Sequence, residues 1–396
     1  MKSLVYLGEY NNARVSKVKL LFVVNVDWFF ISHRLPIALK AQQQGFKVTI
    51  ACRFTSHKAE LKNMGFEVIE LPFNRSGGGF FAELKTIKLL KDTIVKVKPD
   101  VVHAVTIKPV LYAGLALKMM KKKIPFVAAI SGLGYVFTAN TLRAKVTKII
   151  ASLFYKVSLS HPLKTVIFQN SSDEAILTEV TGLTVQDKTL IKGSGADLSV
   201  YNFTPEIEDG HISVVMACRL LKEKGVYEFV NASKLVKDKY PNSKFVLVGS
   251  PDIENPNTVK QSEIDSWVAD GIIEYLGQRN DIPDIFSSSN IVCLPSYYGE
   301  GVPKVLIEAA ACGRAIVTTT NPGCRDAIID NQTGLAVPPR NADSLAKAII
   351  KLIENPNQRR AMGTAARDFA VEQFDVKQVV NKHIKIYQDL IERAAN

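Results

Sequence analysis

The sequence predicts an α/β protein with two doubly wound domains facing each other across a cleft. The first observation is length, because 396 residues exceed one ordinary core and suit two domains of roughly 150 to 200 residues. The second is an alternation of short β-branched runs with helical patterns, which is typical of parallel sheets covered on both faces. The third is that this alternation stops in a polar stretch, residues 191–211, and then begins again.

The first domain is expected to span residues 17–198. Its strands read as near-continuous apolar runs such as KLLFVVN, the pattern of a strand that is buried on both faces. We expect strands at residues 19–25, 47–52, 67–71, 100–105, 125–130 and 165–169, with helices that include residues 35–44, 80–97 and 142–158.

The second domain is expected to span residues 205–372 and to repeat this architecture. Strands are expected at residues 212–217, 244–249, 272–277, 290–295, 315–319 and 334–338. From Ala342 onward the pattern is helical, and Asn355-Pro356 should divide it because proline begins a helix more readily than it continues one. Residues 373–396 form a last helix that could cross back to the first domain.

Composition indicates a cytoplasmic globular protein. No apolar run reaches the ~18 residues of a membrane span, and the N-terminal residues are too polar for a signal peptide. The five cysteines form no C-x-x-C pair and have no companion histidines, so we expect free thiols that pack in the core of a protein from a reducing compartment.

Positive charge is concentrated in the first half of the chain. Residues 1–200 hold 28 Lys and Arg against 13 Asp and Glu, a net of +15, whereas the whole chain carries +12. Residues 101–172 include ten basic residues and no acidic one, which favours an anionic partner such as a membrane surface. The expected contacts are Lys118–Lys123 and the amphipathic stretch 142–164, although helical apolar spacing in that stretch more often indicates core packing.

The segment YYGEGVPKVLIEAAACG, residues 297–313, places two carboxylates around the start of a helix. Pro303 suits the first helical position, and the free N–H groups of a first turn suit a phosphate. Glu308 would lie ~8 Å along the helix, where it could accept hydrogen bonds from a nucleotide ribose, while Glu300 meets a sugar. Alternatively, Glu300 complements the helix dipole and Glu308 is a satisfied buried acid.

Two cations, Arg219 and Lys224, follow the first strand of the second domain in MACRLLKEKGVYEF. At that position they could neutralise a diphosphate and stabilise the charge that develops as it leaves. The alternative is ordinary surface basicity.

These residues carry a resemblance to a known family. The R-L-x-x-x-K-G pattern at 219–225, the E-x7-E spacing of Glu300 and Glu308, and residues 313–334 together resemble the retaining GT-B glycosyltransferases of family 4. The resemblance covers nearly all of the chain. Within the family the sequence is similar to bacterial enzymes that extend undecaprenyl-diphosphate-linked oligosaccharides, such as α-N-acetylgalactosaminyltransferases.

The resemblance implies a role for each motif residue. Arg219 and Lys224 would bind the diphosphate of a UDP-sugar, Glu308 its ribose and Glu300 the donor sugar, while backbone amides of Gly301 and Val302 help to hold the phosphate. Attack on the donor would occur from the front face, assisted by the leaving phosphate.

Two positions depart from the family pattern. Many relatives have glycine where this chain has Cys218, and many have a histidine near the donor sugar where this chain has Ser131. These departures leave the expected fold unchanged, but they imply that the far edge of the donor sugar is recognised differently from the family pattern. No cofactor or metal is expected, because the sequence has no D-x-D and neither of the glycine-rich NAD and ATP motifs.

The acceptor side of the cleft carries weaker signals. Asp27 follows the first strand and could act as a base toward an acceptor hydroxyl, with a plain loop carboxylate as the alternative. His33 opens the next helix, and His103 could reach the cleft from a strand end or pack in the core. Together with Ser131 these are the candidate acceptor-binding residues, and the glycine-rich loop Arg75–Gly79 could fold over the acceptor.

The sequence supports one leading function and three alternatives to it. The leading hypothesis is transfer from a nucleotide sugar to a lipid-linked saccharide at the inner face of the cytoplasmic membrane. A UDP-sugar 2-epimerase would need only water and donor, and a two-lobed sugar-binding protein would need no chemistry. A nucleic-acid binder is disfavoured, because no recognisable module or aromatic platform accompanies the basic charge.

Overall fold

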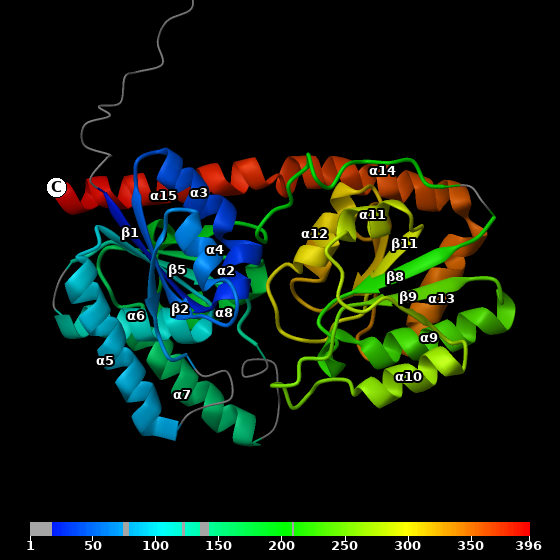
Figure 1. The fold of residues 1–396 in the computed structure, drawn as a ribbon, viewed down its shortest axis with the longest axis horizontal. Coiled ribbons are helices and arrows are strands. Elements are labelled where there is room, and N and C mark those ends of the chain that lie inside the picture. The colour runs from blue at the N-terminus through cyan, green and yellow to red at the C-terminus, as the bar shows by residue number, and fades with distance from the viewer. Residues whose placement is uncertain (1–17, 74–78, 121–122, 135–141, 208–209) are drawn as a thin grey trace, which may run out of the picture.

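The computed structural model describes residues 18–73, 79–120, 123–134, 142–207 and 210–396. They form two α/β domains that lie side by side, each built on one sheet (Figure 1). The predicted doubly wound architecture is therefore confirmed. Most of the predicted glycine-rich loop, residues 75–78, and two basic residues, Lys121 and Lys122, lie outside the described residues.

The first sheet has seven parallel strands in the order β3-β2-β1-β4-β5-β6-β7. The strands are β1 Lys19–Val26, β2 Lys47–Arg53, β3 Glu67–Glu70, β4 Val101–Val105, β5 Phe126–Ile130, β6 Lys164–Phe168 and β7 Lys188–Leu190. All six predicted strands are present. The seventh was not predicted, because β7 has only three residues on the edge of the sheet and carries no apolar run.

Helices cover both faces of the first sheet. They are α2 Asp27–His33, α3 Leu35–Gln43, α4 Lys58–Asn63, α5 Gly79–Val97, α6 Ile107–Met120, α7 Leu142–Ser158 and α8 Ser171–Thr181, with a 3₁₀ turn at Val185–Asp187. Alternate residues of β1 enter two separate cores. Leu20 and Phe22 pack with α3, whereas Leu21 and Val23 pack with α5 and α6.

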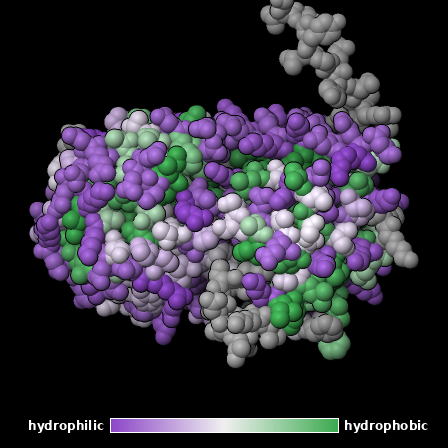
Figure 2. Space-filling model, turned by 180° about the vertical axis from the view of Figure 1, so that it is seen from behind, coloured by the Kyte–Doolittle hydropathy of each residue, from purple (hydrophilic) through white to green (hydrophobic). Residues whose placement is uncertain are grey.

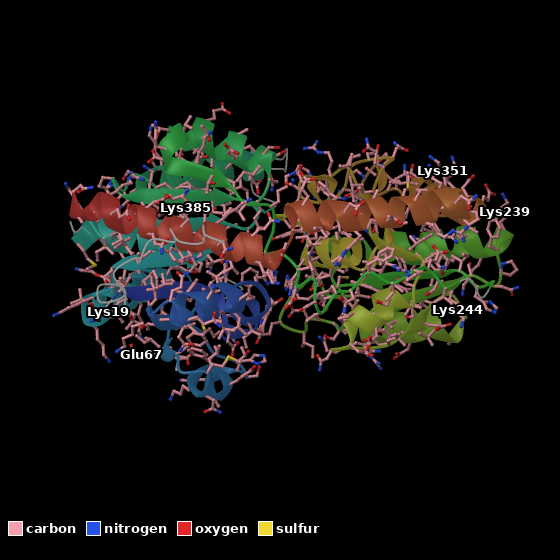
Figure 3. All side chains as sticks on the ribbon, turned by 90° about the horizontal axis from the view of Figure 1, so that it is seen from above. Lys19, Glu67, Lys239, Lys244, Lys351 and Lys385 are labelled. Atoms are coloured by element: carbon pink, nitrogen blue, oxygen red, sulfur yellow. The ribbon has the colours of Figure 1, made fainter. Side chains whose placement is uncertain are left out.

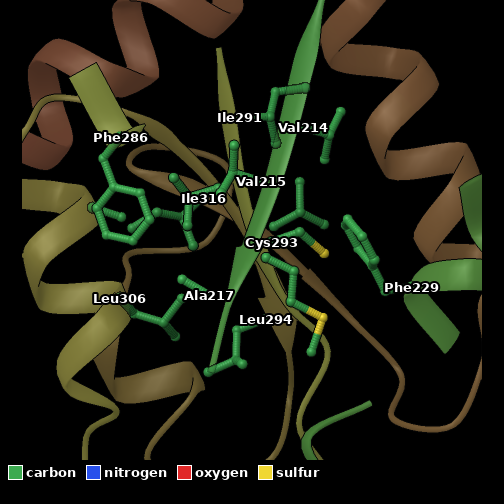
Figure 4. Packing of buried hydrophobic residues seen from close by; sticks show 14 of the residues in the cluster. Val214, Val215, Ala217, Phe229, Phe286, Ile291, Cys293, Leu294, Leu306 and Ile316 are labelled. Atoms are coloured by element: carbon green, nitrogen blue, oxygen red, sulfur yellow. The ribbon is translucent and has the colours of Figure 1, made fainter. Parts of the chain in front are cut away.

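The second sheet has six parallel strands in the order β10-β9-β8-β11-β12-β13. Its strands are β8 Ser213–Ala217, β9 Lys244–Val248, β10 Glu274–Tyr275, β11 Ile291–Leu294, β12 Ala315–Thr319 and β13 Gly334–Val337. Its helices are α9 Val226–Lys239, α10 Gln261–Ala269, α11 Ile282–Ser287, α12 Lys304–Ala311 and α13 Ala342–Glu354, with 3₁₀ turns at Lys222–Lys224 and Arg325–Ala327. Figure 4 shows Phe229, Cys293 and Leu306 packed around its central strands.

The cysteines behave as expected from the sequence. All five are free thiols, and every one except the half-buried Cys218 is buried. Burial raises the pKa of the Cys312 thiol to about 11, so it stays protonated at neutral pH.

The last two helices span both domains. Helix α14 Pro356–Gln373 begins at the predicted break and lies on the second domain, and α15 Val376–Ala395 then runs over the first (Figures 1 and 3). The segment between the two domains holds the junction of α14 and α15 through two backbone hydrogen bonds. Ala196 N–H donates to Phe374 O at 2.8 Å, and Val376 N–H donates to Ala196 O at 3.0 Å. Helix α15 contributes buried side chains to the first core, including Ile384 and Tyr387.

Helix α7 corrects the expectation that its apolar side chains pack in the core. Tyr155 and Leu159 are buried, but Ile149 is 70% exposed and Leu153 is 62% exposed. With Ile150 and Phe154 these residues form an outward apolar face, which we call the α7 apolar face. Apolar surface gathers at this end of the first domain in Figure 2. Among the described residues, no helix is long and apolar enough to cross a bilayer.

Removing part of the α15 contact should weaken the whole fold. Ile384 is buried against the first sheet, so Ile384→Ala should lower the free energy of unfolding by about 2 to 5 kcal/mol in urea denaturation. Lys385 is the exposed neighbour (Figure 3), and Lys385→Ala should change it by less than about 0.5 kcal/mol. Equal effects in the two variants would contradict the packing of α15.

Candidate active site

The predicted donor residues meet at the switch point of the second sheet. Strands β8 and β11 are hydrogen-bonded neighbours, although their connections run to opposite sides of the sheet. Arg219 and Lys224 follow β8, and Glu300 and helix α12 follow β11. Ligands of open parallel sheets bind outside the carboxyl ends of the strands at such a point.

Lys224 and Glu300 form a partly buried ion pair at the centre of this site. Lys224 Nζ lies 2.5 Å from Glu300 Oε2, and the two side chains are 14% and 15% exposed. Ser296 Oγ donates to the other carboxylate oxygen of Glu300 at 2.7 Å. Burial opposes the charge of Lys224, but the Glu300 carboxylate outweighs it and raises the pKa of Lys224.

Arg219 is held from both domains. Its Nη1 lies 3.1 Å from Asp252 Oδ2 in the second domain. Its guanidinium also lies 5.5 Å from the ring centroid of Trp28, which belongs to α2 of the first domain. A cation over an aromatic face is attracted by the ring quadrupole, so Arg219 links the donor side of the cleft to the acceptor side.

Helix α12 differs in one detail from the prediction. Pro303 is the N-cap with ψ 126°, and the helix begins at Lys304. Glu308 is buried one turn later, with Lys304 Nζ 3.3 Å from its Oε1, and Lys304 Nζ also donates to Ser32 O of the first domain at 2.9 Å. Burial and the neighbouring Glu308 carboxylate raise the pKa of Tyr201, so its hydroxyl stays protonated beside Glu308.

Two glycine-containing loops bring the domains into backbone contact. Gly301 N–H donates to Ser131 O at 3.0 Å, and Gly134 N–H donates to Gly299 O at 2.9 Å. We call the contact between residues 131–134 and 299–301 the glycine interface. A Cβ on Gly132 would lie 2.6 Å from Glu300 Cα, and a Cβ on Gly299 would lie 2.8 Å from Gly134 O, so a side chain at either position would press the two loops apart.

The glycine interface corrects one expected role. The amide of Gly301 was expected to help hold a phosphate, but its N–H donates to Ser131 O instead. Val302 is buried beside Gly193, whose added Cβ would lie 3.4 Å from Val302 Cβ.

Asp27 is a structural anchor in this fold, which corrects the prediction of a loop base. It is fully buried and accepts hydrogen bonds from the backbone N–H groups of Thr55, Ser56 and His57 at 2.8 to 3.0 Å, and from Thr55 Oγ1 at 2.7 Å. Burial would raise the pKa of Asp27, but these donors outweigh it and lower the pKa to about 2. A carboxylate so occupied is a poor proton acceptor.

His103 lies in the core, which was the second of the two alternatives that the sequence left open, and not at an acceptor site. It sits inside β4, is fully buried, and its Nδ1 lies 2.6 Å from Tyr387 Oη on α15. Its ring lies 5.6 Å from that of His383. Burial and the neighbouring His383 hold the pKa of His103 well below its usual range, so it is neutral and belongs to the α15 contact rather than to an acceptor site.

His33 and Ser131 lie where the two domains meet. His33 ends α2 rather than opening the next helix, and its ring stacks on Phe29 at 4.2 Å. Burial lowers the pKa of His33 to about 3, with further contributions from Arg34, Lys304 and Lys224. Two of those cations belong to the second domain, so His33 faces the donor residues.

Comparisons with known proteins agree with this geometry. The family model "Glycosyl transferases group 1" matches residues 201–369, and "Glycosyl transferase 4-like" matches residues 19–170. The chain belongs to the GT-B glycosyltransferases. It is 29% identical to the N,N'-diacetylbacillosaminyl-diphospho-undecaprenol alpha-1,3-N-acetylgalactosaminyltransferase of Campylobacter jejuni, over 91% of this chain and 98% of that protein.

Two further relatives extend the comparison. The UDP-Gal:alpha-D-GlcNAc-diphosphoundecaprenol alpha-1,3-galactosyltransferase of Escherichia coli is 21% identical over 87% of this chain and 90% of its own length. The Anabaena protein HepE, solved in complex with UDP, superposes with a TM-score of 0.73 at 17% identity over 94% of this chain and all of its own. The predicted family, the GT-B fold and glycosyltransferase activity are thereby confirmed.

Several site residues were not found from the sequence. Asp252 pairs with Arg219 from 33 residues away, and Ser296 lies four residues before Glu300, but no local pattern marks either residue. Lys304 carried a signal, since it lies four residues before Glu308 on the predicted helix. Among the residues that the structure describes, no group of three or more His, Cys, Asp or Glu side chains could hold a metal ion.

The anchoring role of Asp27 predicts a loss of stability rather than of chemistry. Its depressed pKa stabilises the fold above the ordinary carboxyl pKa of about 3.9, and this contribution is lost as pH falls toward 2. Asp27→Asn should lower the free energy of unfolding at pH 7 by about 1 to 3 kcal/mol, measured by urea denaturation, and the difference from wild type should shrink at pH 2. Unchanged stability with abolished turnover would instead indicate a catalytic base.

Proposed function

We propose that this glycosyltransferase moves a sugar from a UDP-sugar to an undecaprenyl-diphosphate-linked saccharide in surface glycan biosynthesis, with retention of anomeric configuration. The observation that carries the proposal is the set of two cations and two carboxylates at the switch point of the second sheet. Two relatives whose names specify diphospho-undecaprenol acceptors, and which align over most of the chain, support the acceptor.

The donor diphosphate would exchange with carboxylates that now neutralise the cations. Lys224 pairs with Glu300, and Arg219 pairs with Asp252. A bound diphosphate would take over both cations, which would then stabilise the charge that grows on the leaving UDP. Glu300 would be released toward the hydroxyls of the donor sugar, since Ser296 still holds its other oxygen.

Glu308 is suited to the ribose of the donor. Lys304 and Tyr201 fix its carboxylate one turn into α12, within the second domain. Ribose hydroxyls are donors that a carboxylate can accept from in pairs. With cations already supplied by side chains, we propose transfer without a divalent metal, by front-face attack in which the leaving phosphate takes the proton of the acceptor.

The acceptor would be met at the inner face of the cytoplasmic membrane. The α7 apolar face offers exposed aliphatic and aromatic side chains, with Lys148 and Lys156 on the same helix. Lys118 at the end of the neighbouring helix α6 is also exposed, as is Lys123, which follows α6 in the chain. An apolar face flanked by lysines suits insertion into the headgroup region of an anionic surface. The chain would therefore bind the membrane peripherally.

The test of function is a transfer assay. A panel of UDP- and GDP-sugars is incubated with undecaprenyl-diphosphate-linked saccharides and the purified protein, in chelator and with added Mg²⁺. We expect an α-linked product from a UDP-sugar at equal rates in both buffers. Conversion of free UDP-sugar without acceptor would favour the epimerase, and a metal requirement would contradict the metal-free mechanism.

The two glutamates should separate donor binding from chemistry. Glu308→Gln should weaken the binding of free UDP by at least about tenfold, equivalent to ~1.4 kcal/mol, because the ribose hydroxyls lose the carboxylate that accepts their hydrogen bonds. Glu300→Gln should leave UDP affinity within about threefold of wild type while lowering turnover by at least about a hundredfold. Calorimetry with UDP and initial rates measure both, and equal losses of UDP affinity would refute the division of roles.

Changes to the α7 apolar face should weaken membrane binding and leave UDP binding unchanged. Ile149→Ser with Leu153→Ser should reduce co-sedimentation with anionic vesicles at least about tenfold, because two exposed apolar anchors are lost. Ile253→Ser is the matched control, since Ile253 is 94% exposed but lies on the second domain. Affinity for UDP should be unchanged in both. A wild-type protein that ignores anionic vesicles would overturn this part of the proposal.

A further inference from the structure

Arg34 is a buried cation whose hydrogen bonds are incomplete. It follows α2 in the first domain and is 2% exposed. Its Nη1 donates to His33 O at 2.9 Å, its Nη2 lies 3.5 Å from Ser131 Oγ, and its Nε has no partner in the part of the chain that the structure describes. Among the described residues, no carboxylate lies within ion-pairing distance of Arg34. The ionisable side chain that affects the pKa of Arg34 is the Tyr387 hydroxyl.

The other two buried arginines of the described chain are fully accommodated. Arg359 forms a buried ion pair with Glu206, and its Nη1 donates to Leu352 O at 2.5 Å. Arg314 donates to several backbone carbonyls, including those of Ser289 at 3.0 Å and Cys312 at 3.1 Å. A buried cation without a counter-charge costs several kcal/mol. Backbone carbonyls accept from Arg314 and the Glu206 carboxylate neutralises Arg359, whereas Arg34 has, among the described residues, one carbonyl, one hydroxyl at 3.5 Å and no carboxylate.

Arg34 lies on the acceptor side of the active-site cleft. Ser131, which its Nη2 approaches, accepts the Gly301 N–H of the glycine interface, directly beside Glu300. The positive charges of Arg34, Lys304 and Lys224 all lower the pKa of the adjacent His33. Three cations from two domains therefore surround one region, and the carboxylates there, Glu300 and Glu308, already pair with the two lysines.

Further unsatisfied polar atoms lie at the switch point of the first sheet. Asn25 Oδ1 near the end of β1 and Thr106 Oγ1 just after β4 are buried and have no hydrogen-bond partner among the described residues. β1 and β4 are adjacent strands at which the strand order reverses. Buried polar groups are normally satisfied, so this region has the character of a binding site for a polar ligand.

We propose that Arg34 is an oxyanion-binding residue, which receives phosphate oxygens of a diphosphate-bearing substrate from the first-domain side of the cleft. The identity of the substrate rests on the proposed function. A guanidinium suits this role, because it can donate two parallel hydrogen bonds to a phosphate. Burial lowers the pKa of Arg34 to about 10, which leaves it charged at neutral pH. The same chemistry could come from the donor or from the lipid-linked acceptor.

The test replaces Arg34 with an uncharged side chain of similar length. Arg34→Met should leave the melting temperature unchanged or raise it, because an unpaired buried charge is removed. The matched control is Arg359→Met, which should lower the melting temperature, since it strands the Glu206 carboxylate. Arg34→Lys should restore part of any lost ligand affinity.

Calorimetry with two probes identifies the ligand without relying on turnover. UDP represents the donor, and geranyl diphosphate represents a lipid diphosphate. A loss of at least about tenfold in affinity for either probe in Arg34→Met, with the melting temperature maintained, supports the proposal and names the source. Wild-type affinity for both probes overturns it, as does a fall in melting temperature matching that of Arg359→Met. Absence of transfer by the wild-type protein would refute the proposed function. The titrations would still decide whether Arg34 binds a diphosphate, because they do not depend on turnover.

Discussion

The backbone contact at the glycine interface is the constraint on which the site depends. Loops that follow β5 and β11, in different domains, approach closely enough for Gly301 N–H to bond Ser131 O and for Gly134 N–H to bond Gly299 O. A Cβ on Gly132 would lie 2.6 Å from Glu300 Cα. Because Gly132 lacks a side chain, the backbone of Glu300 can lie against the first domain while the Glu300 carboxylate pairs with Lys224 of its own domain.

Charge at the cleft is balanced on one side and unbalanced on the other. In the second domain Lys224 pairs with Glu300 and Arg219 pairs with Asp252. In the first domain no carboxylate of the described residues pairs with Arg34. A diphosphate brings negative charge to a region where carboxylates can be released, so ligand binding can reorganise the site without leaving a cation buried and unpaired.

The sequence predicted what depends on local pattern. Strands were found because buried parallel strands are continuous apolar runs. Four candidate donor-binding residues could be selected because Arg219, Lys224, Glu300 and Glu308 lie in short motifs. Asp27 was misread because its partners lie 28 to 30 residues away in a segment with no motif. His103 was left between two readings, because its partner Tyr387 is 284 residues distant on α15.

Surface and charge state were harder still. Helical spacing on α7 identifies an apolar stripe but does not say which stripe faces the sheet, and the buried one runs through Tyr155 and Leu159. Whether Arg34 has a counter-ion depends on every element around it. Such properties arise from three-dimensional packing and have no local sequence signature.

The most direct measurement is a crystal structure of the protein with UDP. We expect the diphosphate at the first turn of α12, about 3 Å from Lys224 Nζ, with Glu300 released from Lys224 and the ribose hydroxyls on Glu308. UDP bound away from the switch point of the second sheet, or bound there with the Lys224–Glu300 pair intact, would contradict the account.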